Sequence, residues 1–424
     1  MKFSELGTKT LRNSPKDEES VNAKFLIQGG FINKLGAGIY TFLPLGLKVL
    51  NKVESIVREE MDVAGGTELL MPALHPAENW QITGRWDSFD ALLKTKSNFG
   101  GEYAIGPTHE EIIYPLLSHF VSSYKDLPVS LYQIQTKFRD EKRAKSGLMR
   151  CREFRMKDLY SFHATGEDRD KYYEVMRKAY LKIFKRLGLN VIETKASGGT
   201  FSELSQEFQV IAESGEDTIY YCSKCKIGIN KELRRELRSP TSGSLKSDFG
   251  ACSGCKGELI EGHAVEVGNI FPLKKKFAED FKLTFKDKSG KDTLVEAGCY
   301  GLGTSRVIGT IAEVCHDSKG IIWPRSIAPF SVHLLELDGK KAKIKAFTQK
   351  AYKRLLDAGV EVLYDERDVS AGEKFADADL IGIPFRAVIS EKTGGKIELK
   401  ERNSKKIKLI KVDELIKKLN GNIR

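Results

Sequence analysis

The spacing of apolar residues predicts a long helix near the N-terminus. Apolar positions recur at steps of three and four residues, which places them on one helix face: Leu47, Leu50, Val53, Val57 and Met61. Gly65 and Gly66 end this helix, and a strand over residues 68–71 follows before Pro72. The apolar face packs either on the core of the same chain or on a second subunit.

Residues 131–163 predict an antiparallel hairpin. The first arm, 131–138, alternates as a strand does, and the second arm, 150–163, carries polar and aromatic side chains at even offsets on one face. A charged turn over 140–147 joins the arms. The working face holds Arg139, Glu141, Arg150, Phe154 and Asp158. These residue types suit a nucleotide, because arginine can bind a phosphate, a carboxylate can accept from an amino group and an aromatic ring can stack on a base. A solvated charged hairpin is the alternative.

Two polar signals precede predicted helices. Thr108 and Glu111 have the spacing of a capping box, and Glu110 between them is free to offer a carboxylate to an ammonium group. Thr165 and Asp168 have the same spacing before a longer helix. Further strands are predicted over 191–194, 207–210 and 265–271.

The sequence GCYGLGTSR, residues 298–306, precedes an apolar helix over 307–314. Its small residues let a ligand approach the backbone, and Arg306 stands at the helix start, where anions bind. A glycine bend without a ligand is the alternative. From residue 331 onward, strands over 331–335, 360–364, 386–390 and 396–400 alternate with helices over 343–358 and 374–380. This pattern predicts an α/β domain of about 95 residues.

The length and the charge of the chain restrict the classes of function that it can have. A chain of 424 residues should hold two or three domains. No apolar run reaches the length of a membrane span, and the polar N-terminus is unlike a secretory signal, so we expect a cytoplasmic protein. The net charge is +11, and residues 381–424 carry 12 Lys or Arg against 5 Asp or Glu. This basic tail indicates either a nucleic-acid partner or a solvated lysine-rich surface.

Four of the seven cysteines form two close pairs. Cys222 and Cys225 are separated by 26 residues from Cys252 and Cys255. Two CxxC pairs can place four thiolates tetrahedrally around one structural zinc ion. Few apolar residues accompany them, so we expect the metal to supply the fold of this insertion. Four unligated thiols in a disordered insert are the alternative.

Together these motifs resemble those of the class II aminoacyl-tRNA synthetases and, within them, the bacterial-type prolyl enzymes. The first helix with Pro72 resembles motif 1, a dimer-interface element, and this shifts our interpretation of the helix toward a homodimer. FRDE resembles motif 2, and GLGTSR resembles motif 3. The segments typical of the prolyl enzymes are KLGAGIYTFLPLG, GPTHEE, YQIQTKFRDE, REFRMKDLYSFH, GCYG and IAPF.

The resemblance implies a two-step reaction. ATP, with Mg²⁺, and L-proline would give prolyl-adenylate, and the prolyl group would pass to the 3′ end of tRNA(Pro). By similarity, Arg139 contacts the α-phosphate and the proline carboxylate, and Arg306 clamps the γ-phosphate. The implied ATP-binding residues are Arg139, Glu141, Arg150, Phe154, Glu207, Gly303 and Arg306. The implied proline-binding residues are Thr108, Glu110, Arg139, Asp158, His163 and Gly298.

The resemblance also implies a domain arrangement. An α+β catalytic domain built on an antiparallel sheet would comprise residues 1–217 and 265–328, with a zinc-binding insertion over 218–264. An α/β anticodon-binding domain would comprise 329–424, and its tRNA-facing residues would be Arg367, Lys374 and Asp377. The insertion is too short for the editing domain that many bacterial prolyl enzymes carry. We therefore expect no cis-editing of alanyl-tRNA(Pro) and reliance on a separate deacylase.

Two other interpretations keep part of this picture. A synthetase-like paralogue would bind RNA without catalysis, and a zinc-dependent nucleic-acid-binding module would lack catalysis altogether. Loss of Arg139, Arg306 or Glu110 would favour the first, but all three are present. The full ATP-binding set argues against the second.

Overall fold

The structure is a computed structural model that describes residues 1–15, 17–236, 252 and 254–421. Contacts divide it into two compact units, one of residues 36–39 and 54–310, the other of residues 1–35, 40–53 and 311–424. The predicted domain boundaries at 217, 264 and 328 stay a prediction, because contacts alone do not define a functional domain. Among the described residues, no helix is long and apolar enough to cross a membrane.

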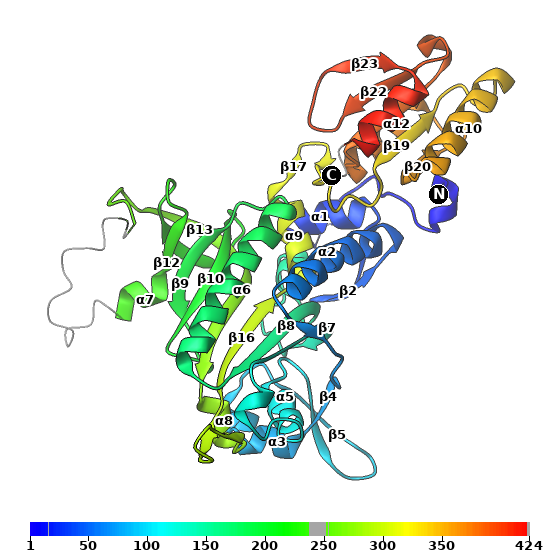
Figure 1. Cartoon of the computed structure of the whole chain (residues 1–424). Coiled ribbons are helices and arrows are strands. Elements are labelled where there is room, and N and C mark those ends of the chain that lie inside the picture. Colours follow the sequence, from blue (N-terminus) through cyan, green and yellow to red (C-terminus); the bar gives the residue numbers. More distant parts are fainter. Residues whose placement is uncertain (16, 237–251, 253, 422–424) are drawn as a thin grey trace. The chain divides into compact units, whose positions relative to one another are not determined.

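A nine-stranded sheet is the centre of the unit that contains residues 54–310 (Figure 1). Its order is β10-β9-β12-β11-β13-β16-β8-β7-β3. The strands are β3 (Thr67–Glu68), β7 (Val129–Phe138), β8 (Glu153–His163), β9 (Ile192–Ser197), β10 (Leu204–Ile211), β11 (Asp217–Tyr221), β12 (Ile227–Asn230), β13 (Ile260–Lys274) and β16 (Glu296–Leu302). The predicted hairpin is β7 and β8, which pair antiparallel. Its second arm begins three residues later than expected, so Arg139 and Arg150 lie in the connecting turn.

Helix α6 (Gly166–Arg186) lies across one face of this sheet (Figure 1). Its buried Tyr180 packs on Phe208 of β10, with ring centroids 5.2 Å apart. Thr165 caps the helix by accepting a hydrogen bond from the Asp168 amide at 3.2 Å. The Asp168 carboxylate instead contacts His163, so only half of the predicted capping box forms.

Strands of the predicted insertion belong to the nine-stranded sheet. Because β10 pairs with both β9 and β13, the strands β10, β9, β12, β11 and β13 close into a ring. Ile192, Ile219 and Ala264 are buried together among these strands. We expected a metal to supply the fold of residues 218–264, but β11 and β12 take their backbone hydrogen bonds from β13 and β9. Residues 237–251 and 253 lie outside the described residues.

Smaller elements flank the sheet. The three-stranded sheet β4-β6-β5 carries two short helices, and α2 is the predicted N-terminal helix. These elements are α2 (Pro44–Val63), β4 (Leu74–Pro76), α3 (Ala77–Ile82), α4 (Arg85–Ser88), β5 (Leu93–Lys96), β6 (Glu102–Ile105), α5 (Glu110–Leu117), α7 (Lys231–Glu236), α8 (Lys276–Asp280), β14 (Thr284–Lys286), β15 (Asp292–Leu294) and α9 (Thr304–Val314). The predicted capping box of Thr108 and Glu111 is wrong, because α5 starts after His109 and no side chain caps it.

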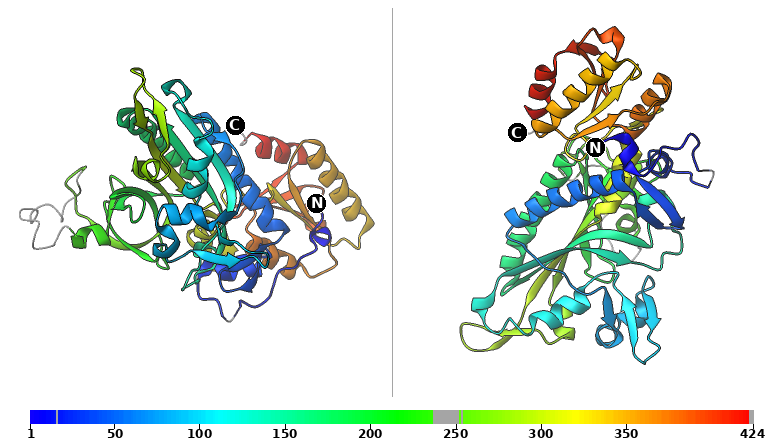
Figure 2. Two further views of the ribbon diagram at one scale, coloured as in Figure 1. Left: turned by 90° about the horizontal axis from the view of Figure 1, so that it is seen from below. Right: turned by 90° about the vertical axis from the view of Figure 1, so that its right-hand side faces the viewer.

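The C-terminal residues form the predicted α/β domain. Its sheet has the order β20-β19-β21-β22-β23, with the first three strands parallel. Helices α10 and α12 cover one face and α11 the other (Figure 2). The elements are β19 (Val332–Glu336), α10 (Ala342–Asp357), β20 (Val362–Asp365), α11 (Ala371–Ile381), β21 (Phe385–Ile389), β22 (Ile397–Glu401), β23 (Ile407–Ile410) and α12 (Val412–Asn420). Strand β23 and helix α12 were not predicted. Elsewhere, α1 (Val21–Gln28), β1 (Ile32–Gly36), β2 (Ile39–Phe42), β17 (His316–Asp317) and β18 (Gly320–Ile321) complete the chain.

Candidate active site

Two adjoining cavities lie on the face of the nine-stranded sheet that points away from α6. They measure about 280 and 300 Å³ and share Arg139, Glu266 and Arg306 on their walls. The first is also lined by Thr108, Phe154, Asp158, Phe201, Cys299 and Gly303. The second is also lined by Glu141, Arg150, Glu216 and Asp217. Most of the residues predicted to bind substrate therefore meet in one continuous site.

Two arginines stand where the cavities join. The Arg139 guanidinium lies over the Phe154 ring, 5.2 Å from its centroid, and within the described chain its Nε has no hydrogen-bond partner. Arg306 donates through Nη1 to the Glu266 carbonyl at 3.1 Å and lies 3.3 Å from its carboxylate. Burial, and then the charge of Arg306, lowers the pKa of Arg139. Two cations that disfavour each other in a sheltered cavity suit an anionic ligand.

The second cavity has a carboxylate beside a further arginine. Arg150 donates to Glu141 at 2.6 Å and also pairs with Glu216. Burial opposes ionisation of Glu141, but the hydrogen bond and charge of Arg150 outweigh it and lower the pKa of Glu141. Glu141 is therefore a carboxylate at neutral pH, as an acceptor for a base amino group must be.

The opposite end of the first cavity presents a buried carboxylate. Glu110 accepts a hydrogen bond from the Thr108 hydroxyl at 2.6 Å and another from the Cys299 thiol at 3.3 Å. Thr108 and Cys299 line the cavity. Glu110 itself is fully buried behind them. A cation that entered here would meet the Thr108 hydroxyl and, behind it, the buried carboxyl group of Glu110.

Arg85 supplies the charge that balances this end, and sequence reasoning missed it. Its Nη1 donates to Glu111 at 2.8 Å and lies 3.5 Å from Glu110. Four aromatic rings surround its guanidinium, with centroids 4.8–5.4 Å away: Trp80, Phe89, Phe201 and Phe277. Burial raises the pKa of Glu111 to about 7, against the opposing charge of Arg85. No periodicity in the sequence distinguishes Arg85 from a surface arginine.

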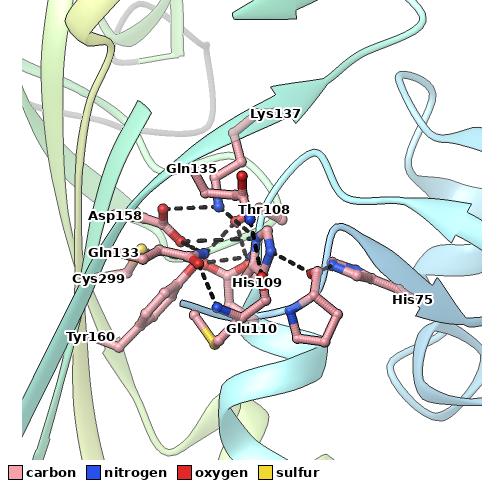
Figure 3. Close-up of polar contacts among 12 residues, drawn as sticks. His75, Thr108, His109, Glu110, Gln133, Gln135, Lys137, Asp158, Tyr160 and Cys299 are labelled. Atoms are coloured by element: carbon pink, nitrogen blue, oxygen red, sulfur yellow. Dashed lines mark hydrogen bonds and ion pairs between the residues drawn. The ribbon is translucent and has the colours of Figure 1, made fainter. Parts of the chain in front are cut away.

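Lys137 is the second residue that sequence reasoning missed. Its fully buried ammonium lies 2.8 Å from the Asp158 carboxylate and contacts Nδ1 of His109 (Figure 3). His109 and His75 both reach the Pro72 carbonyl through Nε2, at 3.0 Å each. Burial lowers the pKa of His75 to about 4 and that of His109 well below its ordinary value, so both rings are neutral. Lys137 thus ties the loop before α5 to the hairpin. The sequence feature that could have identified Lys137 is its spacing: Gln133, Gln135 and Lys137 occupy alternate positions and so lie on one face of a strand.

Besides Glu110, two predicted proline-binding residues do not line either cavity. His163 stands five residues after Asp158 on β8, an odd offset that turns it to the opposite face of the sheet. There its Nδ1 contacts Asp168 of α6 at 2.7 Å. Gly298 likewise alternates with Cys299, and a Cβ atom at Gly298 would lie 2.3 Å from the Tyr300 hydroxyl oxygen. Packing against Tyr300 therefore explains this glycine.

Three carboxylates gather beside Arg306. Glu207 accepts hydrogen bonds from Gln209 at 2.7 Å and from Asn269 at 3.4 Å. Burial, followed by the charges of Glu266 and Asp217, raises the pKa of Glu207 to about 9. Glu207 lines neither cavity, but its neighbours Asn269 and Glu266 do. Because its pKa is raised, Glu207 is largely protonated at neutral pH, and the cluster carries less negative charge than three carboxylates would. A bound cation would favour ionisation of Glu207.

The four paired cysteines converge. Their sulfur atoms all lie within 4.8 Å of one another. Each pair forms the same turn: the Lys226 amide donates to the Cys222 carbonyl at 3.0 Å, and the Lys256 amide donates to the Cys252 carbonyl at 2.8 Å. Both lysines adopt a left-handed backbone, with φ of 55° and 60°. This donor set fits a tetrahedral metal, since sulfur atoms bound to one zinc ion lie about 3.8 Å apart.

In the C-terminal domain, the predicted tRNA-facing residues form an internal network. Lys374 is buried and donates to the carbonyls of Glu336 at 2.6 Å and Asp365 at 3.1 Å. Arg367 pairs with the carboxylates of Asp365 and Asp377 at 2.7 Å each. Arg367 and Lys374 also line a cavity of about 1080 Å³ that is rimmed by exposed lysines.

Comparisons with known proteins match this architecture over its whole length. The model of the class II tRNA synthetase core domain (G, H, P, S and T) matches residues 93–315, and the anticodon binding domain matches residues 327–422. A proline--tRNA ligase of Ehrlichia chaffeensis is 40% identical over 426 aligned positions, which cover 99% of this chain and 100% of that protein. One of Sulfurihydrogenibium is 37% identical over 549 positions, with 97% of each chain covered.

Solved structures show the same fold. The prolyl-tRNA synthetase of Cryptosporidium parvum complexed with halofuginone and AMPPNP has a TM-score of 0.77 at 17% identity, covering 94% of this chain and 76% of that one. That of Giardia lamblia in complex with prolyl-adenylate has a TM-score of 0.75 at 19% identity, covering 93% and 75%. The full-length identity to the curated relatives confirms the resemblance found in the sequence, and the chain belongs to the proline–tRNA ligase family of class II tRNA synthetases.

Proposed function

We propose that this chain activates L-proline with ATP and transfers the prolyl group to the 3′ end of tRNA(Pro). One observation supports this most directly: Arg139 and Arg306 share the walls of a site that has a base-sized ring at Phe154 and a buried carboxylate at Glu110. Each part of prolyl-adenylate therefore has a complementary group. Charging of tRNA(Pro) with proline in preference to every other amino acid is the expected result, and preferential charging with another amino acid would contradict it.

In the first step, formation of prolyl-adenylate, the rate would depend on positioning the substrates and neutralising their charge. Adenylation brings the proline carboxylate to the α-phosphate, so two anions must approach each other. Arg139, at the junction of the cavities, would contact both, and Arg306 would hold the γ-phosphate. Preorganised cations in a sheltered site stabilise the charge that develops on phosphorus, and no covalent enzyme nucleophile is required.

Thr108 and Glu110 would hold the other end of the amino acid. The prolyl ammonium would donate to the Thr108 hydroxyl and the Glu110 carboxylate. Arg85 would keep Glu110 in place through its buried contact. Phe154 would stack on adenine, and Glu141 with Arg150 would face the nucleotide from the second cavity.

Mg²⁺ would bind next to the triphosphate, near Glu207, Asp217 and Glu266. Burial and mutual repulsion raise the pKa values of Glu207 and Asp217, which a divalent cation would reverse. The ion would neutralise phosphate charge when bound. His163 and Gly298 remain in the proposal only as residues that support the proline site from the opposite face of β8 and β16.

We further propose that the chain lacks cis-editing. The alignment with the Sulfurihydrogenibium ligase is 125 positions longer than this chain, whereas that with the Ehrlichia ligase is of nearly its length. Between β10 and β13, the described segments are the short strands and helix β11, β12 and α7. Small apolar amino acids are hard to separate by binding alone, so a separate deacylase would clear alanyl-tRNA(Pro). Hydrolysis of alanyl-tRNA(Pro) by the purified chain would refute this proposal.

Structural zinc at Cys222, Cys225, Cys252 and Cys255 is a third proposal. The convergent thiols and paired turns support it. No cysteine among the described residues forms a disulfide. Elemental analysis of the purified full chain should give one zinc ion per chain; zinc far below one equivalent would contradict the assignment.

Dimerisation through the motif 1 region and anticodon recognition by the C-terminal domain complete the proposal. Val63 and Leu70 expose 78% and 73% of their surface at the end of α2 and after β3, as expected of an interface. A Val63→Asp variant should shift the molecular mass measured by light scattering from dimer toward monomer. Arg367, Lys374 and Asp377 would shape the lysine-rimmed cavity that takes anticodon bases, with the exposed lysines contacting phosphates.

A further inference from the structure

The cysteine cluster is the tip of an element that ends at the active site. Cys222 directly follows β11, and Cys225 is separated from β12 by one residue, Lys226. The second cysteine pair leads into β13 at Ile260. One metal ion at the four thiols would therefore fasten the ends of three neighbouring strands of the ring.

Strand β9 runs from the cysteine cluster to the substrate cavity. At its start, the Glu193 amide donates to the carbonyl of Lys226 at 2.9 Å. β12 then pairs with β9 in parallel, from Ile227 opposite Glu193 to Ile229 opposite Lys195. The two strands pack closely, since a Cβ atom at Gly228 would lie 2.9 Å from the Thr194 hydroxyl oxygen. β9 ends at Ser197, which lines the first cavity.

Helix α7, which follows β12, holds the end of β9. The Ser197 amide donates to the Glu232 carboxylate at 3.1 Å. The Glu232 amide in turn donates to the Asn230 side chain at 3.3 Å, and Asn230 donates to Glu207 at 3.4 Å. Two parts of the proposed active site, the cavity wall and the carboxylate cluster, are thus each held by a contact with one residue of the insertion, Glu232 and Asn230 respectively.

The loop after Ser197 forms one wall of the first cavity. Gly198, Gly199, Thr200 and Phe201 all line it. Phe201 packs against Phe271 with ring centroids 4.9 Å apart and also contacts the Arg85 guanidinium, which lies 4.8 Å from its ring centroid. Two glycines in succession give this loop little stiffness of its own, so its position depends on the packing of Phe201 and on the contact that holds Ser197 at its start.

We propose that the four-cysteine cluster braces the substrate cavity: a metal ion there holds β12 and α7 against β9 and so fixes the wall formed by residues 197–201. This rests on the proposed structural zinc. The insertion would then support the wall of the proposed active site.

The test uses the full-length protein and three variants. Cys255→Ser removes a metal ligand, Glu232→Ala removes the contact to Ser197 and keeps all four thiols, and Glu258→Ala is a control at an exposed glutamate near the cluster. Zinc content, hydrogen exchange of a peptide spanning residues 197–201 and the KM values for ATP and proline are measured for each.

Cys255→Ser should lose zinc, exchange at residues 197–201 should quicken by about tenfold, and both KM values should rise by about three- to tenfold. Glu232→Ala should keep zinc and reproduce the faster exchange and higher KM values, while Glu258→Ala should match the wild type. If Cys255→Ser does not fold, Glu232→Ala decides. Unchanged exchange and KM values in Glu232→Ala would overturn the role of the contact between α7 and β9. A zinc-free wild type, or a folded Cys255→Ser that loses zinc with unchanged exchange and KM values, would overturn the role of the metal ion and with it the brace.

Discussion

The guanidinium of Arg139 lies over the ring of Phe154, 5.2 Å from its centroid, and both side chains line the same cavity. Arg139 comes from the turn after β7 and Phe154 from β8, so the hairpin itself brings cation and ring together. The aromatic face holds the guanidinium by a cation–π contact. The pair places the group that we propose binds phosphate beside the ring that we propose binds the base.

Replacing Phe154 should therefore weaken ATP binding selectively. Phe154→Leu removes the stacking surface, worth about 1–3 kcal/mol for a base, so the KM for ATP should rise roughly tenfold or more. Phe154→Tyr keeps the ring and should stay near the wild type. Initial rates of pyrophosphate exchange at varied ATP measure this; a rise in the KM for proline alone would contradict the role.

Arg85 should control proline binding without touching proline. Arg85→Lys retains the charge but loses the planar group that four rings enclose and the reach to Glu110 and Glu111. The KM for proline should rise by about tenfold or more, with little change in the KM for ATP. Arg354→Lys, at a half-exposed arginine of α10, serves as the control. Equal changes in both KM values would indicate a general structural defect instead.

Glu207 should destabilise the substrate-free protein increasingly as pH rises. Its pKa is raised to about 9 in the folded chain, so between about pH 4.5 and 9 the folded state binds more protons at this group than the unfolded state. Stability contributed by this group therefore falls as pH rises through that window. Glu207→Gln should melt higher than the wild type by about 2 °C or more at pH 8, with the difference shrinking toward pH 5. The same variant should need more Mg²⁺ for half-maximal exchange; a melting difference independent of pH would contradict the assignment.

Lys374 should matter for the stability of the C-terminal domain more than for RNA contact. Lys374→Met removes the ammonium that donates to two buried carbonyls and lies 3.9 Å from the Asp365 carboxylate, at a cost of about 1–3 kcal/mol. Scanning calorimetry should show a lower melting temperature for Lys374→Met, while Lys345→Ala, at a rim lysine of the cavity, should leave it unchanged. An unaltered melting profile with weakened tRNA binding would instead indicate that Lys374 contacts RNA.

Local patterns in the sequence predicted most of the framework. Even offsets along the strand correctly predicted that Phe154 and Asp158 lie on one face. The same rule would have placed His163, at an odd offset from Asp158, on the opposite face. Arg85 and Lys137 escaped because their partners, Glu110 and Asp158, are 25 and 21 residues distant, and only the fold brings them together. The insertion was misjudged for a similar reason: short strands such as β12 are recognisable only by the strand beside which they lie.

Proline-dependent exchange of pyrophosphate into ATP, measured without tRNA, tests the central claim most directly. The wild-type chain should catalyse exchange with L-proline, Arg139→Ala should lose it by on the order of 10³-fold, and Arg143→Ala, at an exposed arginine four residues along the same turn, should retain it. Near-normal exchange by Arg139→Ala, or no proline-dependent exchange by the wild type, would contradict the account.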